Sequence, residues 1–221
     1  MTGAEVFQRA RSPEQKAQRR AAILDAAARL GAANGVRRVS LGDIAKSVGL
    51  TKSNVLRYFE TREDIYLQLT AAGYHNWVTR VTARLDAFDT VGPAQIAAAL
   101  AEGLADDALF CDLVSEGPVT LEHNVSAEVV RAFKGSLYEA IDDLAAVLSQ
   151  RQPGLDPRRA NQVIAAASML AAGLWPWCNP PPVLAGLYIT DPDVVRSPME
   201  FVPQLRQLLE ALTVGLLHAA A

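Results

Sequence analysis

Four residues in one short stretch carry side chains suited to contact with nucleic acid: Lys52, Ser53, Leu56 and Arg57. On a helix whose opposite face is anchored in the protein by Val55 and Phe59, all four would point outward. Arginine and lysine donate hydrogen bonds to guanine or to phosphate, serine can do either, and leucine can touch a thymine methyl group. The spacing therefore predicts a short helix that reads base edges in the major groove of DNA.

Positions at which helices are expected to begin offer a second kind of contact, with phosphate. These positions are Ser40, Thr51 and Arg62. Hydroxyl groups, free backbone N–H groups and a positive side chain all favour an anion at a helix N-terminus. We expect these three residues to contact the DNA backbone.

The charge of the chain is divided unevenly along its length. Residues 1–62 carry 12 Lys and Arg against five Asp and Glu, a net charge of +7. Residues 63–221 carry nine against 19, a net charge of −10, so the whole chain has a net charge of −3. Because phosphate neutralisation requires clustered basic residues, this division indicates a small nucleic-acid-binding module on a body that does not bind nucleic acid. A solvated basic face would have the same composition.

Motifs typical of other protein classes do not occur. The sequence has no phosphate-binding loop, GxSxG, HExxH or paired CxxC motif, which argues against an enzyme. His75 and His123 have no set of further ligands at metal-binding spacing, so neither a metal nor a cofactor is expected. A structural helical interaction protein would not explain the basic N-terminal quarter, and a non-specific architectural DNA binder would not need the acidic body.

The sequence also bears on compartment and membrane. Cys111 and Cys178 are too few for a disulfide framework, and the N-terminus has no signal-peptide pattern, so a cytoplasmic protein is expected. No Asp, Glu, Lys or Arg occurs between Arg159 and Asp191. This stretch is rich in alanine and contains several prolines, so a buried helix is expected there rather than a membrane span.

Apolar residues recur at spacings of three and four nearly everywhere, which predicts an all-α protein. Helix starts are expected at Ser12–Pro13, Ser40, Thr51 and Thr61, and later at Ser126, Asp156–Pro157 and Ser197–Pro198. The helices 40–48 and 51–59, joined by a turn at Gly49, form a helix-turn-helix. The helix from Thr61 is expected to be long, with an apolar stripe from Tyr66 to Phe88.

Two domains follow from this organisation. Residues 1–60 would form a three-helix DNA-binding domain with the helix-turn-helix, of which residues 1–11 would be a flexible basic arm. Residues 61–221 would form a larger helical domain, joined to the first domain through the fourth helix.

The run from Val39 to Leu67, VSLGDIAKSVGLTKSNVLRYFETREDIYL, resembles the DNA-binding module of TetR-type transcriptional regulators. The residues that match in type and spacing are Ile44, Ala45, Gly49, Thr51, Phe59, Arg62 and Glu63. Members of that family commonly have a tyrosine where this chain has Leu56, so Arg57 or Tyr58 would supply the corresponding phosphate contact. The resemblance implies a homodimer with a helical ligand-binding body.

A dimer is also expected because helix-turn-helix proteins bind two half-sites symmetrically. The resemblance implies an interface built from the last helices, for which we select seven residues: Ala166, Gly173, Leu205, Leu208, Leu209, Leu212 and Leu216. Small residues permit close approach of helices, and leucines supply apolar area. The alternative is that these residues form the core of one subunit.

Candidate effector contacts are residues near helix breaks and on apolar helices of the body: Phe110, His123, Asn124, Tyr138, Met169, Trp175, Trp177 and Cys178. Pro176 should disturb its helix and expose backbone groups there. The few charges among these residues favour an apolar or aromatic small molecule. The sequence as a whole predicts a ligand-responsive repressor of transcription, with an activator or a non-specific DNA binder as the alternatives.

Overall fold

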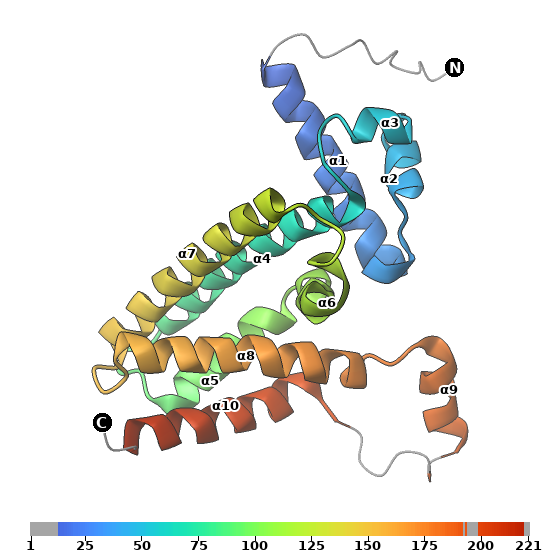
Figure 1. The fold of residues 1–221 in the computed structure, drawn as a ribbon. Coiled ribbons are helices and arrows are strands. Elements are labelled where there is room, and N and C mark those ends of the chain that lie inside the picture. Colours follow the sequence, from blue (N-terminus) through green and yellow to red (C-terminus); the bar gives the residue numbers. More distant parts are fainter. Residues whose placement is uncertain (1–12, 192, 194–198, 219–221) are drawn as a thin grey trace.

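The computed structural model describes residues 13–191, 193 and 199–218, and within them it contains ten α-helices and no strand (Figure 1). The expected basic arm of residues 1–11, the cap at Ser12 and the helix start at Ser197–Pro198 lie outside the described residues. The helices are α1 (Pro13–Asn34), α2 (Leu41–Ser47), α3 (Lys52–Val55), α4 (Arg62–Leu85), α5 (Pro93–Ala105), α6 (Ala108–Glu116), α7 (Ala127–Arg151), α8 (Pro157–Cys178), α9 (Pro182–Thr190) and α10 (Phe201–His218).

Most predicted helix starts are confirmed, and the caps explain why. The Ser40 hydroxyl accepts a hydrogen bond from the Asp43 backbone N–H at 3.2 Å, and the Asp43 carboxylate accepts one from the Ser40 backbone N–H at 2.9 Å. This reciprocal capping box satisfies two N–H groups that a helix N-terminus leaves free. Similar caps begin α3, α4, α7 and α8 at Thr51, Thr61, Ser126 and Asp156.

The helices α1 to α3 form a small N-terminal module around the buried side chains of Ile23, Ile44, Val55 and Phe59. The turn between α2 and α3 depends on Gly49, whose φ is +65°. That left-handed conformation is strained for residues with a side chain, so glycine is required at this turn.

The body is a helical bundle in which α7 lies beside α4, and α10 packs on α5 and α8 (Figure 1). Its centre is aromatic: the rings of Tyr74 and Phe110 meet edge to face with centroids 5.0 Å apart, and Trp77 donates to the Leu100 carbonyl at 3.1 Å. The missing side chain at Gly73 makes room for the Phe110 ring, because a Cβ at Gly73 would lie 2.3 Å from the ring carbon Cδ2.

Three features differ from the sequence expectation. The helix α3 ends at Val55 rather than at Phe59. The residues after it form a turn with i→i+3 hydrogen bonds, such as the one from the Tyr58 N–H to the Val55 carbonyl at 2.9 Å, and Phe59 is buried in the core. Phe88 is exposed, because α4 ends at Leu85 and the stripe ends with it. The helix α8 continues past Pro176 to Cys178, so the proline does not break it.

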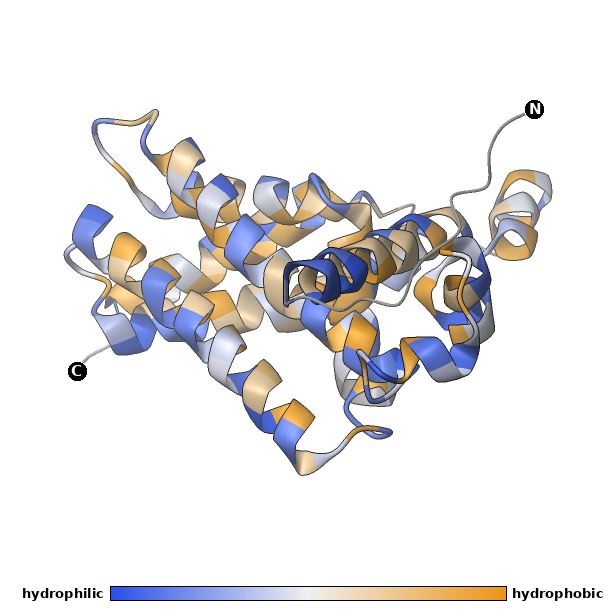
Figure 2. Cartoon of the chain, turned by 90° about the horizontal axis from the view of Figure 1, so that it is seen from above, coloured by the Kyte–Doolittle hydropathy of each residue, from blue (hydrophilic) through white to orange (hydrophobic). Residues whose placement is uncertain are grey.

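The helix α9 is apolar but has no buried residue, and it stands apart from the other helices (Figures 1 and 2). Its Val183 and Ile189 are 88% and 82% exposed. Among the described helices, none is both long and apolar enough to cross a lipid bilayer.

Candidate functional site

The surface of the short helix α3 and of the turn that follows it, residues 52–59, is divided as the sequence predicts. Val55 and Phe59 are buried in the N-terminal module, whereas Lys52, Ser53, Leu56 and Arg57 are exposed. Anchoring on one side leaves the cationic and hydroxyl groups on the other side free to meet a partner. The arrangement is that of a helix held for insertion into a groove.

The side chain of Lys52 lies over α2. A Cβ built at Gly42 would come within 2.7 Å of the Lys52 Cε atom and 3.4 Å of its Nζ atom. The missing side chain at Gly42 therefore makes room for the lysine stem. This contact limits the conformational freedom that Lys52 would lose on binding a partner.

The two predicted hydroxyl contacts serve as helix caps. The Ser40 hydroxyl also donates to the Asp43 carboxylate at 2.6 Å, and these hydrogen bonds hold the pKa of Asp43 below its usual 3.8. A carboxylate at the N-terminus of α2 disfavours a second anion there. Thr51 caps α3 through the Asn54 backbone N–H at 3.3 Å, and no carboxylate takes part in that cap.

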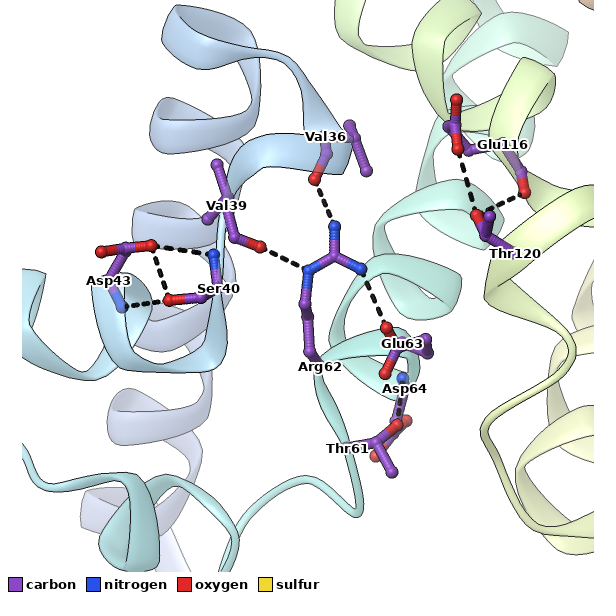
Figure 3. Close-up of polar contacts among 10 residues, drawn as sticks. All are labelled: Val36, Val39, Ser40, Asp43, Thr61, Arg62, Glu63, Asp64, Glu116 and Thr120. Atoms are coloured by element: carbon purple, nitrogen blue, oxygen red, sulfur yellow. Dashed lines mark hydrogen bonds and ion pairs between the residues drawn. The ribbon is translucent and has the colours of Figure 1, made fainter.

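Arg62 is turned into the protein, which the sequence did not predict (Figure 3). Its Nε donates to the Val39 carbonyl at 2.5 Å, a terminal nitrogen donates to the Val36 carbonyl, and the other donates to Glu63 at 2.9 Å. The side chain is 17% exposed, and its guanidinium carbon lies 4.8 Å from the centre of the Tyr66 ring. Arg62 therefore ties the chain after α1 to the start of α4, and we remove it from the set of phosphate contacts.

Two residues of this region were missed by the sequence reasoning. Asn54 is exposed on α3, and its amide has the donor and acceptor pair that suits adenine. Arg20 of α1 donates to the Tyr58 carbonyl and to the Gln68 amide oxygen at 2.6 Å, and it lies 4.3 Å from the centre of the Phe59 ring. Asn54 was predictable from its place on the helix, but the partners of Arg20 are set by tertiary structure.

The predicted interface residues do not share one face. Leu205 and Leu209 are fully buried within the chain, where α10 packs on α5 and α8, which favours the alternative that they form the core of one subunit. Leu208 is 37% exposed, and Leu212, Leu216 and Ala166 are partly buried. Gly173 is exposed, with open space around it.

The predicted effector contacts do not gather in one place. Phe110 is buried against Gly73, His123 and Asn124 are exposed in a loop, and Tyr138, Met169 and Trp177 are exposed on two helices. Trp175 and Cys178 are partly buried near the end of α8. Aromatic and apolar types alone did not reveal which face of each helix is covered, so these eight residues do not define a pocket.

Trp175 instead belongs to a packed polar contact in the body. Its indole Nε1 donates to the Asp112 carboxylate at 2.7 Å, and its ring meets that of Phe201 edge to face at 5.0 Å. Burial raises the pKa of Asp112, the bond from Trp175 lowers it, and nearby Glu116 raises it, with a net upward shift. In the part of the chain that the structure describes, no group of three or more His, Cys, Asp or Glu side chains is arranged to hold a metal ion.

Comparison with solved structures supports the fold. Thermus thermophilus FadR, a TetR-family repressor in complex with lauroyl-CoA, has a TM-score of 0.55 at 18% identity over 91% of this chain and 96% of its own. Bacillus subtilis FadR with stearoyl-CoA has a TM-score of 0.51 at 17% identity, over 91% and 99%. A TetR-family regulator from Rhodococcus RHA1 has a TM-score of 0.51 at 15% identity, over 88% and 96%.

Family models cover nearly the whole chain. The model for bacterial regulatory proteins of the tetR family matches residues 23–69, and the model for the tetracyclin repressor-like C-terminal domain matches residues 71–220. A comparison with curated proteins finds no match. The helix-turn-helix geometry and both family matches lead to one conclusion: the chain belongs to the TetR family of DNA-binding transcriptional regulators and is not an enzyme.

Proposed function

We propose that this regulator is a ligand-responsive repressor that binds its operator as a homodimer and leaves it when a small effector binds. The observation that carries the proposal is the exposed cationic surface formed by Lys52 of α3 and Arg57 of the turn after it, anchored from behind by Val55 and Phe59. In the dimer, two copies of α3 would enter successive major grooves about 34 to 36 Å apart. An activator remains the alternative within the same family.

The DNA contacts that we propose are Thr51, Lys52, Ser53, Asn54, Leu56, Arg57 and Tyr58. Ser40 is a weaker candidate, because Asp43 takes both its hydroxyl and its backbone N–H. Arg57 and Lys52 supply the cationic contacts, and Asn54 adds one that suits adenine. We keep the division at residues 60 and 61 for the two domains, so that all these contacts lie in the first.

The dimer interface that we propose uses the outward faces of α8 and α10. These faces carry large apolar side chains that are exposed, among them Met169, Trp177, Leu208 and Val214. The helix α9 is also apolar and has no buried residue. Burial of exposed apolar area of this kind is the main driving force of subunit association.

The effector that we propose has a substantial apolar part. Two of the similar structures are FadR proteins in complex with stearoyl-CoA and lauroyl-CoA, which are effectors with long acyl chains. At 17% and 18% identity, only the general class of an apolar small molecule is carried over to this chain. Release would follow if the effector binds the DNA-free conformation more tightly than the DNA-bound one.

Gel-shift titration with the promoter next to the gene of this protein tests the proposal. The double variant Lys52→Ala, Arg57→Ala should bind more weakly. The slope of log affinity against log salt should fall by about two for each subunit, or nearly four for the dimer, since each phosphate contact contributes about 0.9. Arg158→Ala is the matched control, because Arg158 is exposed in the first turn of α8, at the end of the body away from the N-terminal module (Figure 1). An unchanged salt slope in the double variant, or no preference over competitor DNA, would contradict the proposal.

A further inference from the structure

A groove of about 720 Å³ lies where the N-terminal module meets the body, lined by residues of α1, α4 and α7 and of the loop between α3 and α4. Its apolar lining comes from Leu67 and Ala71 of α4 and from Val129, Ala132 and Phe133 of α7. None of the effector contacts predicted from the sequence lines it. Its volume falls within the range of small-molecule sites, about 300 to 1,000 Å³.

The charged residues that line the groove are mostly acidic. Three of them are carboxylates, Glu60, Asp64 and Glu128, and one is a guanidinium, Arg20. Arg20 is directed to the Tyr58 carbonyl and the Gln68 amide, as described above. The groove therefore has a net charge of about −2 with its histidine neutral.

The carboxylates are held by neutral donors. Asp64 is 5% exposed and accepts hydrogen bonds from the Glu60 backbone N–H at 2.8 Å and from the Gln68 amide nitrogen at 2.7 Å. Glu60 accepts one from the Ser126 hydroxyl at 2.7 Å. No ion pair among the described residues includes Glu60, Asp64 or Glu128. Their negative charge is thus available to a positively charged ligand.

We propose that this groove binds lipophilic organic cations, with the apolar body of the ligand on the α4 and α7 side chains and its positive charge beside Asp64 and Glu128. An anionic ligand would meet the same carboxylates and be repelled. A delocalised cation suits the site better than a compact ammonium, because it loses less hydration when it is covered.

Because of the position of the groove, such a ligand would act as an effector of DNA binding, an inference that rests on the proposed function. The ligand would contact α1, the loop that follows α3, and both α4 and α7. The Glu60–Ser126 hydrogen bond connects that loop to the start of α7 across the groove rim. A ligand that binds there therefore contacts the N-terminal module and the body at once. It favours the arrangement of these two parts to which it binds more tightly.

Isothermal titration of the full chain with two probes of nearly equal size tests the binding. The probes are tetraphenylphosphonium, a delocalised cation, and tetraphenylborate, its anionic counterpart. We expect one saturable site per chain for the cation and at least tenfold weaker binding of the anion. No saturable binding of the cation, or equal affinity for both probes, would overturn the proposal.

Variants locate the site. Ala132→Trp fills the groove from an exposed position on α7 and should abolish binding of the cation, with folding checked by circular dichroism. Glu128→Gln should weaken binding about two- to fivefold, the range of one exposed charge pair. Glu139→Gln is the matched control, since Glu139 is exposed on nearly the same face of α7, about 16 Å further along, and should leave affinity unchanged. A folded Ala132→Trp variant that binds with unchanged affinity would refute the location.

The two proposals fail separately. If tetraphenylphosphonium does not bind but the protein binds its operator selectively, the groove inference falls and the proposed function stands. If the cation binds at the groove but the operator is not recognised, the proposed function falls and the binding site stands.

Discussion

The inward position of Arg62 leads to a prediction that separates a structural role from a DNA contact. Arg62→Ala removes the donors that reach the Val36 and Val39 carbonyls and the pair with Glu63. The variant should be less stable and should keep the salt dependence of operator binding. A phosphate contact would show the opposite pattern.

The size of the effect follows from these contacts. A hydrogen bond from a charged group contributes about 1.5 to 3 kcal/mol, and a cation over an aromatic ring adds about 0.5 to 1 kcal/mol. The side chain is 17% exposed, so water replaces part of what is lost. We therefore expect Arg62→Ala to lower the free energy of unfolding by about 2 to 4 kcal/mol. Arg62→Lys keeps the charge but not the planar set of donors, and should recover less than half of this.

Urea unfolding at neutral pH, followed by circular dichroism and by tryptophan fluorescence, measures both variants. The midpoint should fall while the denaturant slope stays unchanged. Gel-shift titration across a range of salt concentrations gives the second readout. Unchanged stability together with a salt slope smaller by about two, one contact in each subunit of the dimer, would refute the structural role and restore Arg62 as a phosphate contact.

Three further predictions concern the body and the caps. Gly73→Ala would place a methyl group 2.3 Å from the Phe110 ring. It should lower the free energy of unfolding by about 1 to 3 kcal/mol in the same urea assay. An unchanged free energy of unfolding would mean that the Phe110 ring moves aside without cost. Ser40→Ala removes the hydroxyl bond, the larger of the two Ser40 bonds that depress the pKa of Asp43, and leaves the bond from the backbone N–H. The pKa of Asp43 should therefore rise part of the way toward 3.8 in an NMR titration, and an unchanged pKa would contradict the cause given. The stabilisation from ionised Asp43 is present above about pH 3.8, and it is lost as the pH falls through the lower pKa of the folded protein. The stability of the Ser40→Ala variant should therefore fall less than that of the unchanged protein over this pH range. Burial raises the pKa of the Cys111 thiol to about 12. At pH 8 this thiol should therefore react with a disulfide reagent only after urea is added. Fast labelling of both cysteines in the native protein would contradict the burial of Cys111.

The helix starts were predictable because their signals are local. Ser40, Thr51 and Thr61 each bond to the residue three positions on, so the sequence alone contains both partners. The two faces of α3 were predictable for a related reason. Val55 and Phe59 are the apolar residues at helical spacing, and a module of this size must bury them.

The exposed faces of the helices in the body were not predictable, because they depend on which helix covers which face. Leu205, Leu208 and Leu209 are the same residue type within one turn or so, yet only Leu208 faces outward. The partners of Arg62 are backbone carbonyls more than 20 residues away, and any residue type would supply them. The groove at the module boundary combines residues of several elements, and no short motif in the sequence marks it.

The contact between Gly73 and Phe110 also limits how α4 can move. A shift of α4 along its axis would carry the larger side chains of neighbouring turns into the ring of Phe110, so sliding is sterically blocked, whereas rotation about this point is not. Gly73 lies about 16 Å from the start of α4 and about 18 Å from its end. If α4 tilted about this contact, a displacement at the far end of the helix would appear at Arg62 with similar size and in the opposite direction, because the contact lies near the middle of the helix.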